Sequence, residues 1–223
     1  MSDDFTTQDF IWQLKHSKDP DERLYAAFKL GRDKQAIVIQ PLIEASTDPE
    51  FTVRVRVAEA LGTRDEAALI LPTLQTLITD DNAIVRRTAA DSLGNIGAED
   101  GVIVLCQALH DTDETVRSHA AEALGKIASH DSAKALVDAF LHDEDYNVRY
   151  FAKQSLGNVG KAAVDALIEV STDTQETGLL IEICEILGNL ADKRSKPLLN
   201  TLSEHPDEHI AEMARWALKR IWD

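Results

Sequence analysis

Apolar residues recur along this chain every three or four positions, so that in a helix they would lie on one face. We number as zero the position seven residues before each Leu of a recurring Leu-Gly pair. Offsets −1, +3, +7 and +10 are then mostly aliphatic or small, which makes one helical stripe. Offset −1, for example, holds Val53, Val85, Val116 and Val148. Each such stretch predicts an amphipathic helix, which we call helix B.

A shorter apolar stretch precedes each helix B and predicts a second helix, helix A. Pro41, Pro72 and Pro197 recur at one place in it, and proline is tolerated near the first turn of a helix. Residues 3–16 are expected to form the first helix A. The others are expected at Ile37 to Ala45, Leu69 to Ile78, Val102 to Leu109, Ala133 to Leu141 and Ala163 to Val170.

The two helices recur together at a nearly constant period. The Leu-Gly pair stands at residues 30–31, 61–62, 93–94, 124–125, 156–157 and 187–188, in steps of 31 or 32 residues. A fixed period of this length is the signature of a stacked repeat array, which builds an extended recognition surface. About seven units follow, at residues 3–32, 33–63, 64–97, 98–128, 129–160, 161–191 and 192–223.

Polar residues also keep the register of the repeat. Offset −6 is Asp48, Asp80, Asp111 and Asp143, and we expect each Asp to cap the start of helix B. Gly97 and Gly160 are expected to end such helices. Offset zero is Arg23, Arg54, Arg86, Arg117 and Arg149. An arginine in register with an aspartate predicts a ladder of charge-assisted bonds between adjacent units, so these arginines are expected to hold the fold.

The segment from Asp113 to Ala128, with the sequence DETVRSHAAEALGKIA, resembles the short HEAT-like repeat of the phycobilisome-lyase type. The resemblance covers about residues 10–222 and weakens in the last two units, where offset zero is Leu180 and Ala211. It implies an all-α fold, a right-handed α-solenoid of about seven 31-residue helix-turn-helix repeats, with residues 1–223 as one domain. In the resembled family helix B lines the concave face.

Charge and cysteine content narrow the classes of function. The net charge is −16, spread evenly over both halves, so the chain lacks the basic stripe of a nucleic-acid-binding protein. Cys106 and Cys184 are 78 residues apart and fall within helical apolar patterns, which indicates core residues in a reducing compartment. We expect a cytoplasmic location, since the acidic N-terminus does not resemble a signal peptide and no run of about 18 apolar residues indicates a membrane span.

Candidate binding residues are those that the helical stack does not need. On helix B these are offsets −3, −2, +1, +2, +5 and +9, and seven of the twelve aromatic residues stand there, including all three tyrosines. Exposed aromatic residues mark interaction sites. The predicted surface is an acidic groove with an aromatic centre, suited to a basic or apolar segment of another protein. Its candidate residues are Phe51, Arg56, Arg87, Asp91, His119, Glu122, Tyr146, Tyr150, Phe151, Gln154, Glu182, Glu185 and Trp216.

Enzymatic interpretations have less support in the sequence. None of the seven histidines is followed by Glu, so the His-Glu metal set of one HEAT-repeat enzyme class is missing, and no phosphate loop, HExxH or GxSxG motif is present. We therefore predict a non-catalytic scaffold with no metal or cofactor. The resemblance leaves one alternative open, a bilin lyase subunit that handles a linear tetrapyrrole, with His119 and Arg87 near the chromophore.

Overall fold

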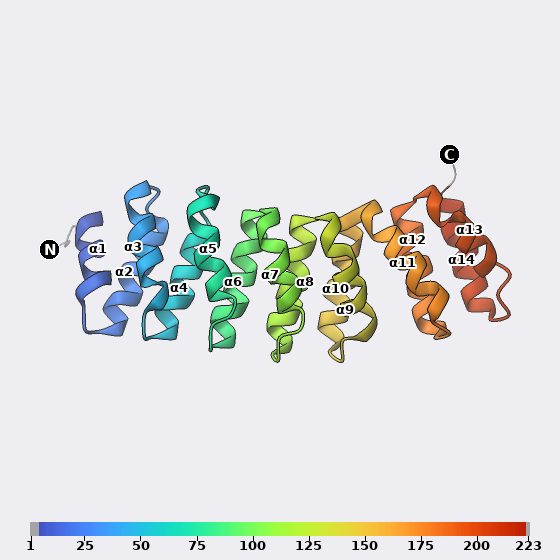
Figure 1. Ribbon diagram of the computed structural model, residues 1–223, viewed down its shortest axis with the longest axis horizontal. Coiled ribbons are helices and arrows are strands. Elements are labelled where there is room, and N and C mark those ends of the chain that lie inside the picture. The colour runs from blue at the N-terminus through green and yellow to red at the C-terminus, as the bar shows by residue number, and fades with distance from the viewer. Residues whose placement is uncertain (1–4, 222–223) are drawn as a thin grey trace. The chain divides into compact units, whose positions relative to one another are not determined.

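A computed structural model describes residues 5–221, apart from the side chain of Asp173. Residues 3 and 4 of the first expected unit and residues 222 and 223 of the last lie outside the described part. Helices joined by turns and short loops make up the described residues, which divide into two compact units, one up to Ala123 and one from Leu124. The predicted alternation of helix A and helix B is confirmed in both units (Figure 1).

The helices of the first unit are named in chain order. They are α1 (Thr7–His16), α2 (Pro20–Arg32), α3 (Ile39–Glu44), α4 (Phe51–Leu61), α5 (Ala67–Leu77), α6 (Ala83–Ile96), α7 (Val102–Ala108) and α8 (Glu114–Ile127), the last of which contains the division between the units. Single 3₁₀ turns lie at η1 (Ala36–Val38), η2 (Ala45–Thr47) and η3 (Glu99–Gly101).

The second unit continues the same order. Its helices are α9 (Ala133–His142), α10 (Tyr146–Val159), α11 (Ala163–Asp173), α12 (Thr177–Leu190), α13 (Lys196–Leu202) and α14 (Glu208–Arg220), with 3₁₀ turns η4 (His130–Ser132), η5 (Gly160–Ala162) and η6 (Lys193–Ser195). The expected helix A segments therefore differ from the observed ones by a few residues at their ends.

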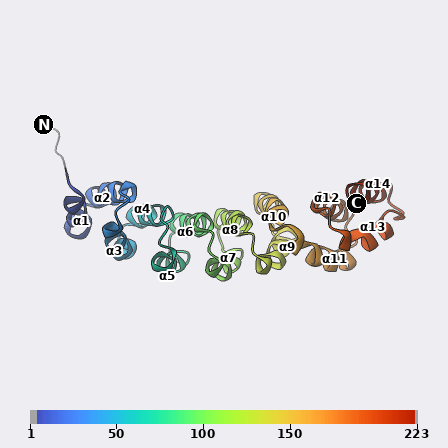
Figure 2. The ribbon, with the colours of Figure 1, turned by 90° about the horizontal axis from the view of Figure 1, so that it is seen from above.

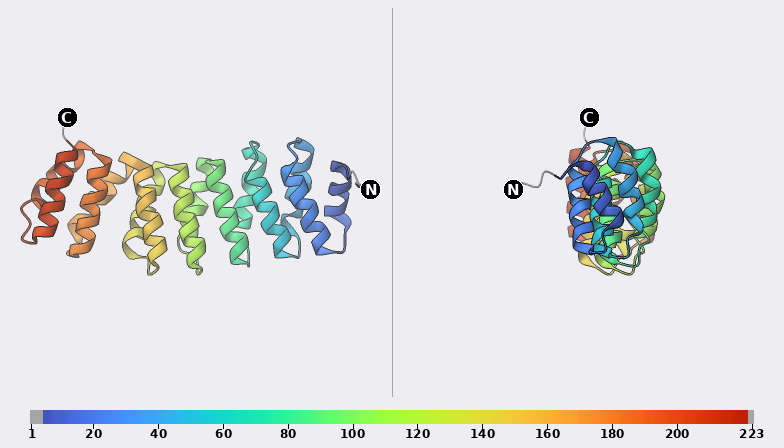
Figure 3. Two further views of the ribbon diagram at one scale, coloured as in Figure 1. Left: turned by 180° about the vertical axis from the view of Figure 1, so that it is seen from behind. Right: turned by 90° about the vertical axis from the view of Figure 1, so that its left-hand side faces the viewer.

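Each unit consists of two layers of helices. In the first unit the B helices α2, α4 and α6 follow one another in one row, and α3, α5 and α7 form the other (Figure 2). In the second unit α10, α12 and α14 form the B row, and α9, α11 and α13 the A row (Figure 2; the order is seen from behind in Figure 3). Side chains on consecutive B helices are therefore neighbours.

The predicted apolar stripe of helix B lies in the core. The Leu of each Leu-Gly pair is fully buried, as are the four valines at offset −1. Burying a side chain of this size contributes about 1.5–3 kcal/mol. Because one such residue recurs in every repeat, each helix pair needs the next one to cover its stripe.

The glycine of the Leu-Gly pair lets consecutive B helices approach closely. A Cβ added at Gly94 would lie 2.8 Å from the Cα of Ala123, and one at Gly62 would lie 2.4 Å from the Oγ of Ser92. Gly31, Gly125 and Gly188 meet Ala60, Ser155 and Ala217 in the same way. In these five joints the facing residue is a small one just before the corresponding Leu of the next B helix. The glycine is thus required by a helix-helix contact, which the sequence analysis did not predict.

One joint breaks this rule. A Cβ added at Gly157 of α10 would meet no atom within 4 Å. The residue that would face it on α12, just before Leu187, is Ile186, which is buried. A branched aliphatic side chain thus stands where the other joints have Ala or Ser. The contact between glycine and a small side chain that joins the other B helices is therefore missing between α10 and α12.

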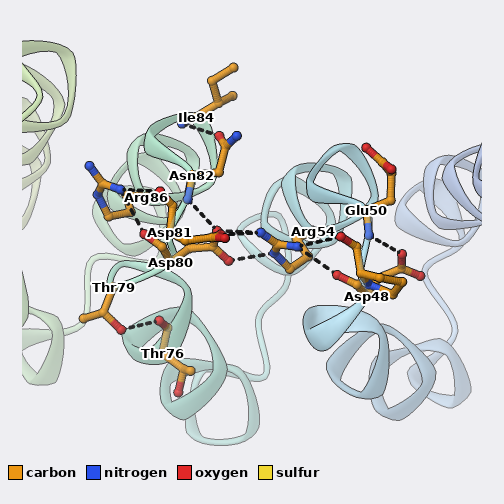
Figure 4. A network of polar contacts seen from close by, with 11 residues as sticks. Asp48, Glu50, Arg54, Thr76, Thr79, Asp80, Asp81, Asn82, Ile84 and Arg86 are labelled. Carbon is orange, nitrogen blue, oxygen red and sulfur yellow. Dashed lines mark hydrogen bonds and ion pairs between the residues drawn. The ribbon is translucent and has the colours of Figure 1, made fainter.

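The predicted arginine-aspartate ladder is confirmed within the first unit (Figure 4). Arg54 donates from Nε and Nη2 to the two carboxylate oxygens of Asp80, at 2.7 Å each. Arg86 makes the same pair of 2.7 Å bonds with Asp111, and Arg23 does so with Asp48 at 2.6 and 2.8 Å. Nη1 of each ladder arginine donates to a main-chain carbonyl six residues earlier. Each arginine thus connects the turn before its own helix to the aspartate of the following repeat.

The expected capping role of the offset −6 aspartates is wrong. The N-cap of helix B lies two residues later, at Asn82 for α6 and Asp145 for α10. The aspartate instead accepts the main-chain N–H of that later residue, as Asp80 does from Asn82 at 2.9 Å, and takes the arginine with the same carboxylate. The predicted stops are confirmed, since Gly97 and Gly160 end α6 and α10 with φ of 70° and 68°.

No helix within the described residues is long and apolar enough to span a membrane. Cys184 is buried in α12, and burial raises the pKa of its thiol to about 12, so it remains protonated at neutral pH as a core residue. Cys106 is half-buried in α7.

Replacing a glycine by alanine should have different effects on stability at the close joints and at the α10–α12 joint. We expect Gly94→Ala to lower the free energy of unfolding by about 1–3 kcal/mol, because the new Cβ overlaps the Ala123 backbone. Gly157→Ala is the matched control, since it has the same helix propensity change but no steric overlap, and it should be neutral or stabilising by up to about 1 kcal/mol. Equal effects in urea denaturation would contradict the close-contact explanation.

The ladder should weaken in acid. Burial raises the pKa of Asp111, but the bonds from Arg86 and from the main-chain N–H of Asp113 outweigh this, so the pKa lies below its ordinary value of 3.8. A lowered folded-state pKa gives stability that is present above the unfolded value and lost as the pH falls through the folded one. Arg86→Gln should therefore cost about 2 kcal/mol at pH 7 and clearly less below about pH 3. Thermal unfolding of both proteins across this range measures the difference, and a pH-independent difference would contradict it.

Candidate functional site

A hollow of about 570 Å³ in the second unit lies between helices α10 and α12. We call it the α10–α12 cleft. Tyr146, Arg149, Tyr150, Lys153 and Gln154 line it from α10, and Glu182, Glu185 and Leu179 from α12. Glu176, Gly178, Asp143, Phe140 and Leu141 complete the lining. Five of the thirteen candidate residues therefore meet here, namely Tyr146, Tyr150, Gln154, Glu182 and Glu185.

Two tyrosines form an exposed aromatic wall on α10. Tyr146 and Tyr150 are 69% and 47% exposed, and their rings stack with centroids 6.4 Å apart because residues four apart share a helix face. Phe151 is half-buried and meets Tyr150 edge-on at 5.5 Å, but it does not line the cleft. The tyrosine pair leaves a large apolar area open to a ligand, and Phe151 supports it from the side.

Opposite charges cross the cleft between α10 and α12. Nζ of Lys153 lies 2.8 Å from Glu185 and 3.2 Å from Glu182. Burial lowers the pKa of Lys153, but the bonds to Glu185 and Glu182 outweigh it, and the pKa lies above its ordinary value. The lysine therefore stays charged and neutralises part of this acidic wall, while Glu176 adds an exposed carboxylate at the start of α12.

Arg149 stands at the ladder position but lacks the ladder's carboxylate. Its Nη1 donates to the carbonyl oxygens of Asp143 and Glu144, at 2.7 and 3.0 Å. The other pairs place an aspartate 25 or 26 positions after the arginine, at offset −6 of the next repeat, and here that offset holds Thr174. Among the side chains that the structure describes, none offers a carboxylate to Nε or Nη2 of Arg149, which lines the cleft.

The cleft coincides with the joint that lacks both repeat contacts. Ile186 replaces the small residue that would face Gly157, and Thr174 replaces the ladder aspartate. Either change removes a contact that joins consecutive B helices elsewhere. The hollow is therefore a consequence of two departures from the repeat pattern at one place.

Six candidate residues lie in the first unit, and two of them, Asp91 and His119, contact each other. Arg56 is paired with Glu59 and lies over the Phe28 ring at 5.3 Å. Asp91 lies 2.7 Å from Nδ1 of His119. The remaining positions in this unit are all half-buried, namely Phe51, Arg87 and Glu122. These residues lie on helices of the B row, and none of them lines the hollow between α10 and α12.

Trp216, the last candidate, packs within the final helix pair. Its ring is the nearest neighbour of a Cβ added at Gly188, at 2.7 Å, and Arg220 lies over it at 5.0 Å. The side chain is 37% exposed. Trp216 therefore lies at the joint between α12 and α14 and does not line the α10–α12 cleft.

Sequence reasoning did not select Arg149, Lys153 and Glu176, three of the charged residues that line the cleft. Arg149 was assigned to the fold, and Lys153 and Glu176 were not singled out. The signal was present, because Thr174 stands where four repeats have Asp, and Ile186 stands where five repeats have Ala or Ser. A search for departures from the repeat finds this joint directly, whereas a search for aromatic residues alone spreads over both units.

The cleft offers a guanidinium, an ammonium, carboxylates and two phenol rings to a ligand. Within the described residues, no three His, Cys, Asp or Glu side chains gather as a metal site. For a linear tetrapyrrole, Arg149 could pair with a propionate and the tyrosines could stack on a pyrrole ring. His119 and Arg87, expected near such a chromophore, lie in the first unit and do not line the cleft.

Comparison with known proteins agrees with this architecture. The sequence matches the family of HEAT repeats over residues 7–72, 70–157 and 104–180. The chain belongs to the HEAT repeat family. No curated protein sequence matches it.

Solved structures show the same fold. A chain of the CpcE–CpcF complex of phycocyanin lyase from Nostoc sp. PCC7120 is 21% identical, with a TM-score of 0.61 over 97% of this chain and 87% of that chain. YibA of E. coli is 24% identical, with a TM-score of 0.62 over 96% and 81%. A chain of the Kap95p–RanGDP complex is 13% identical, with a TM-score of 0.67 over 96% and 34%. Two of the three are complexes between proteins, and the predicted likeness to the phycobilisome-lyase repeat is confirmed.

Proposed function

We propose that this chain is a non-catalytic scaffold or adaptor that binds a segment of another protein in the α10–α12 cleft. One observation carries the proposal, namely a pair of stacked tyrosines that remain exposed on the wall of a hollow between two B helices. The family's stack of helices does not need these rings for its own core. Tyrosine is one of the residues that contribute most to binding at protein interfaces.

The chemistry of the cleft favours a segment with an apolar or basic side chain. An apolar side chain against Tyr146 and Tyr150 would bury their exposed faces, and a basic one would gain a cation–π contact there. Glu176 lies at the same opening and carries the charge opposite to a base. The net charge of −16 also favours the approach of a basic partner.

The polar groups of the cleft support binding over catalysis. Lys153 is held by two glutamates, and Nη1 of Arg149 by two carbonyl oxygens. A nucleophile would need a neighbouring base to activate it. The cysteine of α12 is buried with a pKa of about 12, which keeps the thiol protonated.

Removal of the tyrosine wall should abolish partner binding without unfolding the chain. The double variant Tyr146→Ser, Tyr150→Ser truncates exposed rings, so we expect a change in stability below about 1 kcal/mol. Loss of two interface aromatics should weaken a specific partner by about 100-fold or more. Affinity capture from a lysate of the source cells, with mass-spectrometric comparison of wild type and variant, measures this.

The matched control is Trp12→Ser, because Trp12 is 64% exposed but lies in the first unit. It should retain every partner that the tyrosine variant loses. Recovery of the same proteins by both variants would show that the cleft is not the binding site.

A second function, handling of a linear tetrapyrrole, is favoured by the fold likeness to the phycocyanin lyase chain and by stacked tyrosines beside Arg149. As a bilin lyase subunit or related factor, the chain would hold the chromophore in the same cleft.

Titration of the purified protein with phycocyanobilin separates the two functions. A scaffold should leave the visible absorption spectrum of the chromophore unchanged. A red shift and sharpening that saturate with protein, and that the tyrosine double variant loses, would favour the chromophore-handling function instead.

A further inference from the structure

We infer that the segment bound in the α10–α12 cleft presents an aspartate or glutamate carboxylate to Nε and Nη2 of Arg149. This inference rests on the proposed function and specifies the chemistry that the cleft recognises. The partner's carboxylate would take the place of the aspartate that the ladder lacks at this joint.

The ladder shows what Arg149 is built to bind. In Arg23, Arg54 and Arg86, Nη1 bonds a main-chain carbonyl six residues earlier while Nε and Nη2 grip an aspartate. Arg149 keeps the first of these bonds, at 2.7 Å to the carbonyl of Asp143. That bond holds the guanidinium as it is held elsewhere, so the two donors for a carboxylate are already oriented.

Thr174 keeps part of the local geometry of the ladder aspartate. Its ψ of 145° is close to the 137° of Asp48, with φ of −99° and −55° respectively. Its Oγ1 accepts the N–H of Glu176 at 3.2 Å, as Oδ1 of Asp48 accepts the N–H of Glu50 at 2.9 Å. The local turn is therefore conserved in form while the carboxylate is absent. A guanidinium binds a carboxylate through two parallel hydrogen bonds. Because Nε and Nη2 of Arg149 lack the ladder's aspartate, they are suited to bind a carboxylate from another molecule.

The surroundings of Arg149 indicate where the acid stands in the partner. Tyr146 and Tyr150 are three residues before and one residue after Arg149, and all three line the same cleft. The acid should therefore lie within a few residues of the apolar or basic side chain that covers the tyrosines. A wholly acidic segment would be repelled by the net charge of −16, but this field is screened beyond about 8 Å at physiological ionic strength, whereas the paired bonds act at contact. The segment is thus neutral or basic with one acid.

The variant Thr174→Asp tests the geometry on the full chain without any ligand. It supplies the missing carboxylate from within, so we expect its melting temperature to rise by about 2–4 °C, the shift typical of one well-made bridge in a chain of this size. Thr174→Asn, which can keep the turn but adds no charge, is the matched control and should not rise. A melting temperature of Thr174→Asp at or below that of Thr174→Asn would show that the position does not reach Arg149 and would overturn the inference.

Binding is tested with a phage library of random twelve-residue peptides selected on the full-length protein. Peptides retained by wild type but not by the Tyr146→Ser, Tyr150→Ser variant define binders of the cleft. We expect these to share one Asp or Glu, to lose at least 10-fold in affinity when it is changed to Asn or Gln, and to lose as much on Thr174→Asp, whose internal carboxylate competes for Arg149. Thr174→Asn should bind them as wild type does.

The outcomes separate the inference from the proposed function. Cleft-dependent peptides with no shared acid, or with unchanged affinity for Thr174→Asp, would overturn the inference and leave the scaffold proposal standing. If no selected peptide depends on the tyrosines, both are overturned.

Discussion

The close contact between a glycine and the small residue that faces it on the next B helix sets the spacing on which the rest of this structure depends. With a Cβ at the glycine, the backbones at these joints would have to separate, because the neighbouring atoms lie within 3 Å. The ladder requires the same spacing, since an arginine of one repeat reaches the aspartate of the next only if the repeats are close. Close packing, buried leucine and paired charge therefore reinforce one another, as expected of a sequence whose local and global preferences agree.

The α10–α12 cleft results from relaxing those constraints at one joint. Ile186 is still buried, so the core remains filled, but it replaces a small residue at the point of closest approach. Thr174 keeps the turn while removing a charge that would have been satisfied internally. At this joint Arg149 has no carboxylate partner among the described side chains, and the two tyrosine rings are exposed. A bound partner would supply the carboxylate and cover the rings.

Most of the fold could be predicted from the sequence because a repeat supplies the same information many times. The helices, the buried stripe, the glycine stops and the arginine-aspartate pairs follow from periodicity, and the structure agrees. The role of the offset −6 aspartates was predicted incorrectly, because a carboxylate before a helix is compatible both with a cap and with an Asx turn two residues earlier. The geometry of the arginine decides between these, and that information is not in the local sequence.

The candidate site could be predicted only in part. Exposed aromatic residues at unused helix positions pointed to Tyr146 and Tyr150, which line the cleft, and the same criterion selected Trp216, which lies at the joint between α12 and α14. Arg149 could not be recognised as part of the site by its type or offset, because both are those of a structural residue. What distinguishes Arg149 is Thr174, 25 residues later in the sequence, which supplies no carboxylate to pair with it.

The departure of only two side chains from the repeat at the α10–α12 joint has a consequence for how such chains diversify. Every joint between consecutive B helices has positions equivalent to those of Thr174 and Ile186. Substitutions at these two positions could therefore remove a cleft at one joint and create one at another, with the helices otherwise unchanged. In a protein made of similar repeats, the position of a ligand site is then set by the residues that depart from the repeat pattern. Adding or removing other repeats would leave those residues, and so the site, unchanged.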